Sequence, residues 1–297
     1  METRWLHTTS EDFKKLREES ERVCVIPMGC LEKHSVYLPL GTDVIIANNM
    51  AYDASQLETV CVFPDFAFGD VPCGDHAARP DGTIALDVRI QMLLLENLCG
   101  EISANGFNKI LVVNGHGGNL PWLQTFARNL GCKPHKYVFA YVDVPDTVPH
   151  QMAEFLLEKG SGSIPELTAE DEELIIKYYK ADMQLGHACM QEAAYTMEYA
   201  PESVHLDRLG REDGSPRDLP ELQKLLDLKV RLSMGGWDHL YPDWYAGDDP
   251  YGLNERIARA ATRIATEKLA EVYKAFKEDK FLLGRAKENY KDKTWFE

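Results

Sequence analysis

Three side chains that can bind metal ions lie close together near the start of the chain. Glu32 and His34 are two residues apart, so both point to the same side of an extended segment. Asp43 follows after a proline and a glycine that can turn the chain back. Two carboxylates and an imidazole suit Zn, Mn or Fe in mixed nitrogen and oxygen coordination. These residues therefore predict a metal site, although they would also fit an ordinary polar loop.

A second polar group occurs later, in the sequence NGHGGN at residues 114–119. His116 is followed by Gly117 and Gly118, which let the backbone approach whatever the histidine holds. The alternative is a phosphate loop, because glycines at a helix N-terminus bind anions. The segment lacks the Lys and Ser/Thr of the usual phosphate-binding loop, so the metal interpretation is favoured.

Other histidines occur elsewhere in the chain. His187 lies five residues before Glu192 in the segment 186–201. His76 lies in a long loop rich in Pro, Gly and Asp, and long loops in compact domains are often functional. A surface histidine is an equally good interpretation of His76.

A buried parallel sheet would bring these segments together. Four short apolar runs predict its strands: Val23–Ile26, Thr59–Phe63, Lys109–Gly115 and Lys136–Val144. Segments with helical periodicity separate them, which is typical of a doubly wound α/β fold. Ligands bind at the carboxyl ends of the strands in such sheets. We therefore expect Glu32, His34 and His116 to lie at one sheet edge.

Composition limits the remaining possibilities. The 297 residues, 44% of them hydrophobic, can form a full core, and we predict one domain over 1–297 with a polar insertion at 145–182 near the site mouth. The net charge of −16, without a long basic cluster, argues against nucleic acid and anionic membranes as partners. The chain shows no export signal and no membrane-spanning apolar run. Seven cysteines without a C-x-x-C pair indicate a reducing cytoplasm.

The motifs also form an ordered set. P-x-G-x-x-E-x-H ending in LPLGTD is followed by D-G-T-I-x-L, NGHGGN, H-A-x-x-x-E and G-D-x-P. This set resembles the creatininase family of metal-dependent amidohydrolases. The resemblance implies a three-layer α/β/α fold with a mostly parallel central sheet, and a cytoplasmic, usually hexameric enzyme. It further implies hydrolysis of a non-peptide C–N bond in a small cyclic amide or formamide.

The resemblance also implies roles for single residues. Glu32 and His116 would bind one divalent metal ion, Zn, Mn or Fe. His34 and Glu192 would bind a second ion, and Asp43 would bridge the two. Two neighbouring metal ions need a shared anionic ligand, and a short Asp suits that position.

His187 would be the acid/base of this reaction. We expect a metal-bound hydroxide to attack the amide carbonyl and His187 to protonate the leaving nitrogen. The ordinary pKa of histidine, about 6.5, allows proton transfer in both directions near neutral pH. The alternative is a structural histidine outside the site.

The chain also departs from the family pattern. Most members have Gly-Pro-His where this sequence has Ser35, Val36 and Tyr37. Members that act on creatinine have an aromatic residue and an acid where this chain has Gly117 and Gly118, so we expect a substrate other than creatinine. The candidate substrate-binding residues are Tyr37, His76, Gly117 and Gly118.

Two other functions compete with this hypothesis. A non-catalytic metal-binding or small-molecule-binding protein on the same scaffold would explain the missing family histidine, but all five expected ligands are present. An NAD- or phosphate-binding protein is disfavoured, because no G-x-G-x-x-G follows the first strand. The aromatic segment 237–245, which is apolar for an exposed loop, adds to the expectation of a homohexamer.

Overall fold

The sheet contains the four predicted strands. The computed structural model describes residues 1–71, 79–133, 135–230 and 237–290. The strands are β1 (Val23–Met28), β2 (Cys61–Val62), β3 (Lys109–Asn114) and β4 (Val138–Asp143). They pair in the order β2-β1-β3-β4, and every pair is parallel. The prediction of a parallel α/β fold is confirmed. Most of the observed strand ends differ from the predicted ends by one or two residues.

The two central strands end level with each other. Val23 of β1 pairs with Lys109 of β3, and the register continues to Met28 and Asn114. Every residue of both strands is buried, which explains why their sequences run apolar without alternation. The loops that follow β1 and β3 therefore leave the sheet side by side, at its carboxyl edge.

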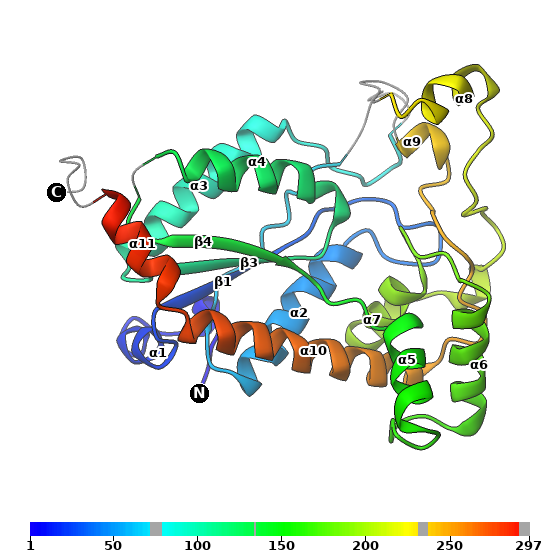
Figure 1. Cartoon of the computed structure of the whole chain (residues 1–297), viewed down its shortest axis with the longest axis horizontal. Helices are drawn as coiled ribbons and strands as arrows, with labels where there is room; N and C mark the ends of the chain where they lie inside the picture. Colours follow the sequence, from blue (N-terminus) through cyan, green and yellow to red (C-terminus); the bar gives the residue numbers. More distant parts are fainter. Residues whose placement is uncertain (72–78, 134, 231–236, 291–297) are drawn as a thin grey trace.

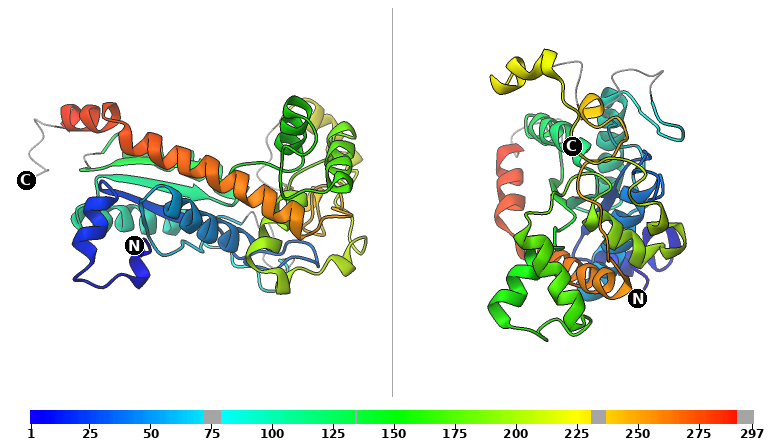
Figure 2. Two further views of the ribbon diagram at one scale, coloured as in Figure 1. Left: turned by 90° about the horizontal axis from the view of Figure 1, so that it is seen from below. Right: turned by 90° about the vertical axis from the view of Figure 1, so that its right-hand side faces the viewer.

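Helices cover both faces of the sheet, as Figure 1 shows. One face carries α2 (Thr42–Leu57), α7 (Met190–Tyr199) and α10 (Glu255–Glu278), whose side chains share a hydrophobic core with β1 and β3. The other face carries α3 (Val88–Ala104) and α4 (Leu120–Leu130). This is the expected three-layer arrangement. Figure 2 shows the length of α10, which runs alongside α2.

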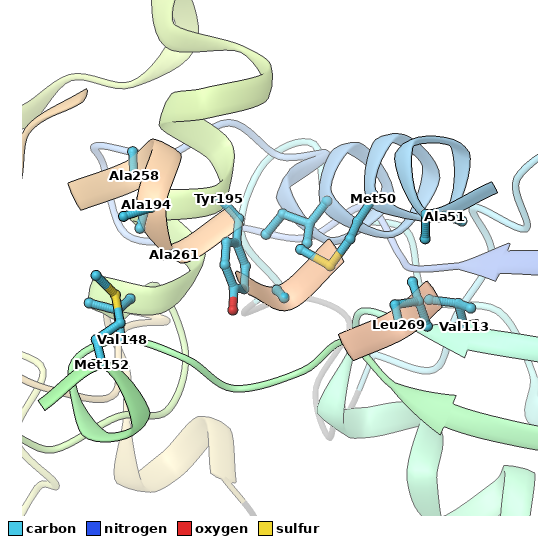
Figure 3. Packing of buried hydrophobic residues seen from close by; sticks show 14 of the residues in the cluster. Met50, Ala51, Val113, Val148, Met152, Ala194, Tyr195, Ala258, Ala261 and Leu269 are labelled. Atoms are coloured by element: carbon cyan, nitrogen blue, oxygen red, sulfur yellow. The ribbon is translucent and has the colours of Figure 1, made fainter. Parts of the chain in front are cut away.

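The core beneath α2 and α10 is tightly filled. Figure 3 shows Met50 of α2 and Leu269 of α10 packed near Val113 of β3. Tyr195 of α7 is also buried there, and its hydroxyl lies 2.8 Å from that of Thr147. Burying each large apolar side chain contributes about 1.5–3 kcal/mol, so this core fixes α7 firmly against α2 and α10.

The other elements lie around this frame. The segment predicted to be an insertion forms α5 (His150–Lys159) and α6 (Ala169–Lys180), which pack on each other. The short elements are η1 (Trp5–His7), α1 (Phe13–Glu19), η2 (Gly117–Asn119), η3 (Pro201–Ser203), η4 (Leu206–Arg208), α8 (Pro220–Asp227), α9 (Trp237–Leu240) and α11 (Phe281–Tyr290). Among the described residues, no helix is both long and apolar enough to cross a membrane. The assignment of 1–297 to one domain stays a prediction.

The aromatic segment 237–245 packs largely within its own chain. Trp244 and Tyr245 are 4% and 2% exposed. Trp237 lies against Trp244, with ring centroids 5.7 Å apart. The segment therefore gives no support to a subunit interface, and the homohexamer stays a prediction from the family resemblance.

Candidate metal centre

Two glycines at the strand ends bring Asp43 to the sheet edge. Gly29 follows β1 and Gly115 follows β3, and the first turn of α2 lies directly on both. A Cβ on Gly29 would meet the Val44 nitrogen at 2.6 Å, and one on Gly115 would meet the Asp43 carbonyl oxygen at 2.6 Å. Any larger residue would push α2 away. The predicted ligand Asp43 therefore lies between the loops that carry Glu32, His34 and His116.

His34 is fully buried and fixed by two contacts. Its Nδ1–H donates to the Glu32 carbonyl oxygen over 3.1 Å. Because that carbonyl can only accept, the ring must carry its proton on Nδ1, which leaves Nε2 as the inner nitrogen. Nε2 lies 3.0 Å from Asp43 Oδ1 and 3.8 Å from Glu192 Oε2. One imidazole nitrogen therefore faces two carboxylates.

His116 is arranged in the same way on the other side of Asp43. Its Nε2–H donates to the Asp70 carbonyl oxygen over 2.6 Å. Its Nδ1 lies 2.9 Å from Glu32 Oε1 and 3.1 Å from Asp43 Oδ2. One oxygen of Asp43 therefore faces His34 and the other faces His116, which is the arrangement expected of a bridging carboxylate.

His187 is the third histidine with this pattern. Its Nε2–H donates to the Lys33 carbonyl oxygen over 2.7 Å, and its Nδ1 lies 3.7 Å from Glu32 Oε1. Its ring lies beside that of His34, with centroids 4.1 Å apart. A ring nitrogen held by a backbone carbonyl, with the other directed at a site, is the usual way in which proteins orient metal-site histidines.

The backbone around His187 is held by the segment that precedes α10. His187 exchanges two backbone hydrogen bonds with Ala246, of 2.8 and 2.9 Å. Gly186 permits this approach, because a Cβ there would meet the Ala246 oxygen at 2.5 Å. Glu192 lies in the first turn of α7, and its Oε2 accepts from the Ala188 N–H over 2.6 Å. His187 and Glu192 are therefore positioned as one unit.

The charges in this cluster shift several pKa values. Burial alone would lower the pKa of His34, but the carboxylates of Asp43 and then Glu192 outweigh it and raise that pKa to about 9. Glu32 and Asp43 likewise raise the pKa of His116 against the effect of burial. Burial raises the pKa of Glu192 to about 7, with His34 opposing it. In the metal-free protein, His34, His116 and Glu192 therefore bind protons more tightly than the same side chains do in water.

His187 behaves differently. Burial, followed by the positive charge on His34, lowers its pKa to about 4. The expectation of an ordinary value near 6.5 is therefore wrong for the metal-free site. A neutral His187 can accept a proton at physiological pH.

The donor atoms of the cluster fit the binding of divalent cations. Glu32 Oε1 is buried, and within the described residues it has no hydrogen-bond partner, although His116 Nδ1 lies only 2.9 Å away. In the metal-free site the raised pKa of His116 keeps a proton between these two atoms, and a cation bound there would take the place of that proton. Among the described residues, three overlapping sets of potential ligands each have their donor atoms within 4.8 Å of one another. The sets are Cys30, Glu32, Asp43 and His116; Glu32, His34 and His187; and His34, Asp43 and Glu192.

A cavity of about 370 Å³ opens onto this cluster. Its lining includes Glu32, His116, His187 and Glu192 on the polar side. Three glycines and Trp237 form much of the remaining wall. This volume is at the lower end of the range for small-molecule sites.

The candidate substrate-binding residues lie in different places. Gly117 and Gly118 line the cavity, and a Cβ on Gly117 would meet nothing within 4 Å. Tyr37 is buried behind the His187 loop, where its hydroxyl donates to the Ala188 carbonyl oxygen, and it is not among the lining residues. His76 lies outside the residues that the structure describes.

Three residues of the site were not expected from the sequence. Cys30 donates its thiol to Asp43 Oδ2 over 3.1 Å. Trp237 lies edge-to-face on His187, with ring centroids 5.0 Å apart. Glu212 binds both Lys33 and Ser35, on either side of His34. Cys30 could have been found from its place two residues before Glu32, whereas no sequence pattern marks the other two.

The sequence comparison agrees with this geometry. The Creatininase family model, described as creatinine amidohydrolase, matches residues 6–273. The chain therefore belongs to the creatininase family. A putative creatinine amidohydrolase from Bacteroides fragilis has a similar structure, with a TM-score of 0.68 and 23% identity over 94% of this chain and 97% of that one. A solved creatininase gives a TM-score of 0.67 and 14% identity, covering 94% and 99% of the two chains.

Two curated relatives are named for different activities. The mycofactocin precursor peptide peptidase of Mycolicibacterium smegmatis is 30% identical over 133 residues, 42% of this chain and 52% of that protein. A 2-amino-5-formylamino-6-ribosylaminopyrimidin-4(3H)-one 5'-monophosphate deformylase of Methanobrevibacter ruminantium is 32% identical over 110 residues, 35% and 43% of the two chains. The chain spans about half the length of the curated relatives it matches.

Proposed function

We propose that this protein is a divalent-metal-dependent amidohydrolase that cleaves a C–N bond of a cyclic amide or formamide. The observation that carries the proposal is the position of Asp43. Its Oδ1 faces His34 and its Oδ2 faces His116, so one carboxylate connects two histidine and carboxylate sets. Two-metal hydrolases require this kind of shared ligand.

The chain's own side chains divide between the two proposed ions. Glu32 and His116 would hold one, His34 and Glu192 the other, and Asp43 both. Bound divalent ions polarise an amide carbonyl and make water a stronger nucleophile near neutral pH. Crystal structures of creatininase include forms described as Zn-Zn and Mn, which supports zinc and manganese as candidates here.

His187 is the proposed proton-transfer group. Its Nε2–H is held by Lys33, so the proton can be taken up and released only at Nδ1. His187 lines the cavity, where Nδ1 can take a proton from the attacking water and give it to the leaving nitrogen.

The cavity supports a planar amide as the substrate. Trp237 offers a flat aromatic wall, and the open space over Gly117 leaves room where creatinine hydrolases carry a side chain. One relative is named as a peptide peptidase and another as a deformylase, so the family hydrolyses amides of different sizes. We infer that the substrate of this chain is not creatinine.

A substrate panel tests this proposal. Purified protein is stripped with a chelator, reloaded with Zn²⁺ or Mn²⁺, and assayed on lactams, hydantoins, formamides, creatinine and short peptides. We expect metal-dependent turnover of at least one lactam, hydantoin or formamide, and no turnover by the Asp43→Asn variant. Bound metal without turnover of any compound would favour a non-catalytic binding protein instead. Cleavage of peptides alone would replace the proposed substrate class.

We also infer a cytoplasmic homohexamer from membership of the family. Exposed apolar side chains on α3, among them Ile90 at 56% and Leu93 at 61%, are available for subunit contact. Light scattering at micromolar concentration should give about six times the mass of one chain. A monomeric mass would refute this assembly.

A further inference from the structure

Cys30 occupies an unusual position for a buried cysteine. It follows β1 by two residues and is 0% exposed, with Val71 and Trp244 packed around it. Its sulfur does not point into this apolar cluster alone, because Sγ lies 3.1 Å from Asp43 Oδ2. A thiol that only fills space would not need a buried carboxylate as its neighbour.

The surroundings of the sulfur indicate a complete set of ligands. The donor atoms of Cys30, Glu32, Asp43 and His116 all lie within 4.8 Å of one another. A separate observation supports a cation among them, namely the buried Glu32 Oε1, which accepts no hydrogen bond of good geometry within the described part of the chain and lies 2.9 Å from His116 Nδ1. One sulfur, one imidazole nitrogen and two carboxylate oxygens are the donor types that tetrahedral zinc accepts.

Within the described residues, the other set of metal ligands contains no sulfur. Its potential ligands are His34, Asp43 and Glu192, which supply only nitrogen and oxygen. Soft thiolate ligands favour zinc, whereas carboxylate-rich sites suit manganese and other hard ions. The two halves therefore differ in the metal that they prefer.

We propose that Cys30 is a ligand of the metal bound by Glu32 and His116, and that it makes this half of the centre selective for zinc. The inference rests on the two-metal site proposed above. On metal binding the Sγ–H proton leaves to solvent and a sulfur–metal bond forms, with no change of oxidation state. Asp43 Oδ2 then loses the thiol as a hydrogen-bond donor and becomes free to bind the same ion.

Cobalt substitution tests the sulfur bond without an enzyme assay. The chelator-stripped protein is titrated with Co²⁺, which takes the place of zinc and gives a near-ultraviolet charge-transfer band when a thiolate is bound. We expect this band in the wild type, and its loss in Cys30→Ala and Cys30→Ser at unchanged circular dichroism. Cys99→Ala is the matched control, because Cys99 is equally buried but lies in the core beneath α3, and it should keep the band.

Metal competition tests the selectivity. Cys30→Ser should lower zinc affinity at least about tenfold relative to the wild type and leave manganese affinity nearly unchanged. Cobalt bound to the wild type without a thiolate band, or a band that persists in Cys30→Ala, would overturn the role of Cys30 but leave the metal centre intact. A folded wild type that binds no cobalt would overturn the centre itself, and this inference with it.

Discussion

The two halves of the candidate site are built in different ways. Glu32, His34 and His116 follow the ends of β1 and β3, and Asp43 lies in the first turn of α2 above them. The side chains of these four residues are at most 7% exposed. The other half comes from residues 186–192 and from α9, and it faces the cavity. Its Glu192 and His187 side chains are 18% and 12% exposed.

This difference separates two tasks. The strand-end half is fixed by the sheet register and by two glycines that allow no larger side chain, so its donor atoms are preorganised for metal. The other half depends on the hydrogen bonds between His187 and Ala246 and on α7. We infer that the first half supplies most of the metal ligands, whereas the second half adds Glu192 and supplies the groups that determine the reaction and the substrate. The predictions below test this division.

Removal of Asp43 should have the largest effect, because its carboxylate would bind both proposed metal ions. Asp43→Ala should lose both metal ions and all activity, measured by elemental analysis of the reloaded protein. Glu192→Ala should lose mainly one ion, since the other ion keeps Glu32, His116 and Asp43 as ligands. Asp53→Ala, a half-buried position on the same helix, should keep full metal content. Full retention of metal in Asp43→Ala would contradict the bridging role.

Substitution of His187 should affect the reaction and spare the metals. His187→Asn should keep its fold and both ions but lose about 10²–10⁴ in kcat, which is the usual contribution of general acid–base catalysis. A substrate with a better leaving group should recover part of this loss, because its nitrogen needs less protonation. The exposed His7→Asn serves as a control. Near wild-type turnover by His187→Asn would exclude the role.

The stability of the metal-free protein should depend on pH in a definite direction. The folded state raises the pKa of His34 from 6.5 to about 9, so the folded protein binds more protons than the unfolded chain between these values. This contribution is fully present below about pH 6.5 and is lost as the pH rises to 9. The raised pKa of His116 acts in the same direction.

Thermal unfolding of chelator-stripped and reloaded protein measures this effect. The melting temperature of the stripped protein should fall between pH 6.5 and 9, whereas that of the reloaded protein should change less, because metal takes the place of the protons. Parallel curves for the two forms over this range would show that the histidines do not bind the added metal.

Substitution of Glu212 should produce the smallest effect. It accepts from Lys33 Nζ over 2.6 Å and from Ser35 Oγ over 2.8 Å, and the Lys33 carbonyl orients His187. Ser35 has a φ of +53°, a conformation that favours glycine, so this clamp also holds a strained residue. Glu212→Ala should lower kcat about tenfold with KM and metal content unchanged.

Glu212→Gln keeps one acceptor oxygen and should recover part of that rate. The exposed Glu202→Ala is the control and should behave as the wild type. Lower thermal stability of Glu212→Ala with an unchanged kcat would reduce Glu212 to a purely structural role.

The sequence predicted the strand-end half better than the other half. The apolar runs before Glu32 and His116 indicate buried strands, and parallel strands end at one edge, so the proximity of these residues follows from local patterns. Glu212 is placed by its contact with Lys33, more than 150 residues earlier in the chain. Trp237 is placed by its packing against His187. No local periodicity encodes either contact. Tyr37 illustrates the same limit, because its direction is set by Tyr245 and Ala188.

Anomalous diffraction from crystals of the reloaded protein tests the central claim most directly. Data collected at the zinc and manganese absorption edges should show two metal peaks, one on each side of the Asp43 carboxylate. Glu32 and His116 should contact the first, and His34 and Glu192 the second. A single peak, or two peaks of which Asp43 contacts only one, would contradict the two-metal account.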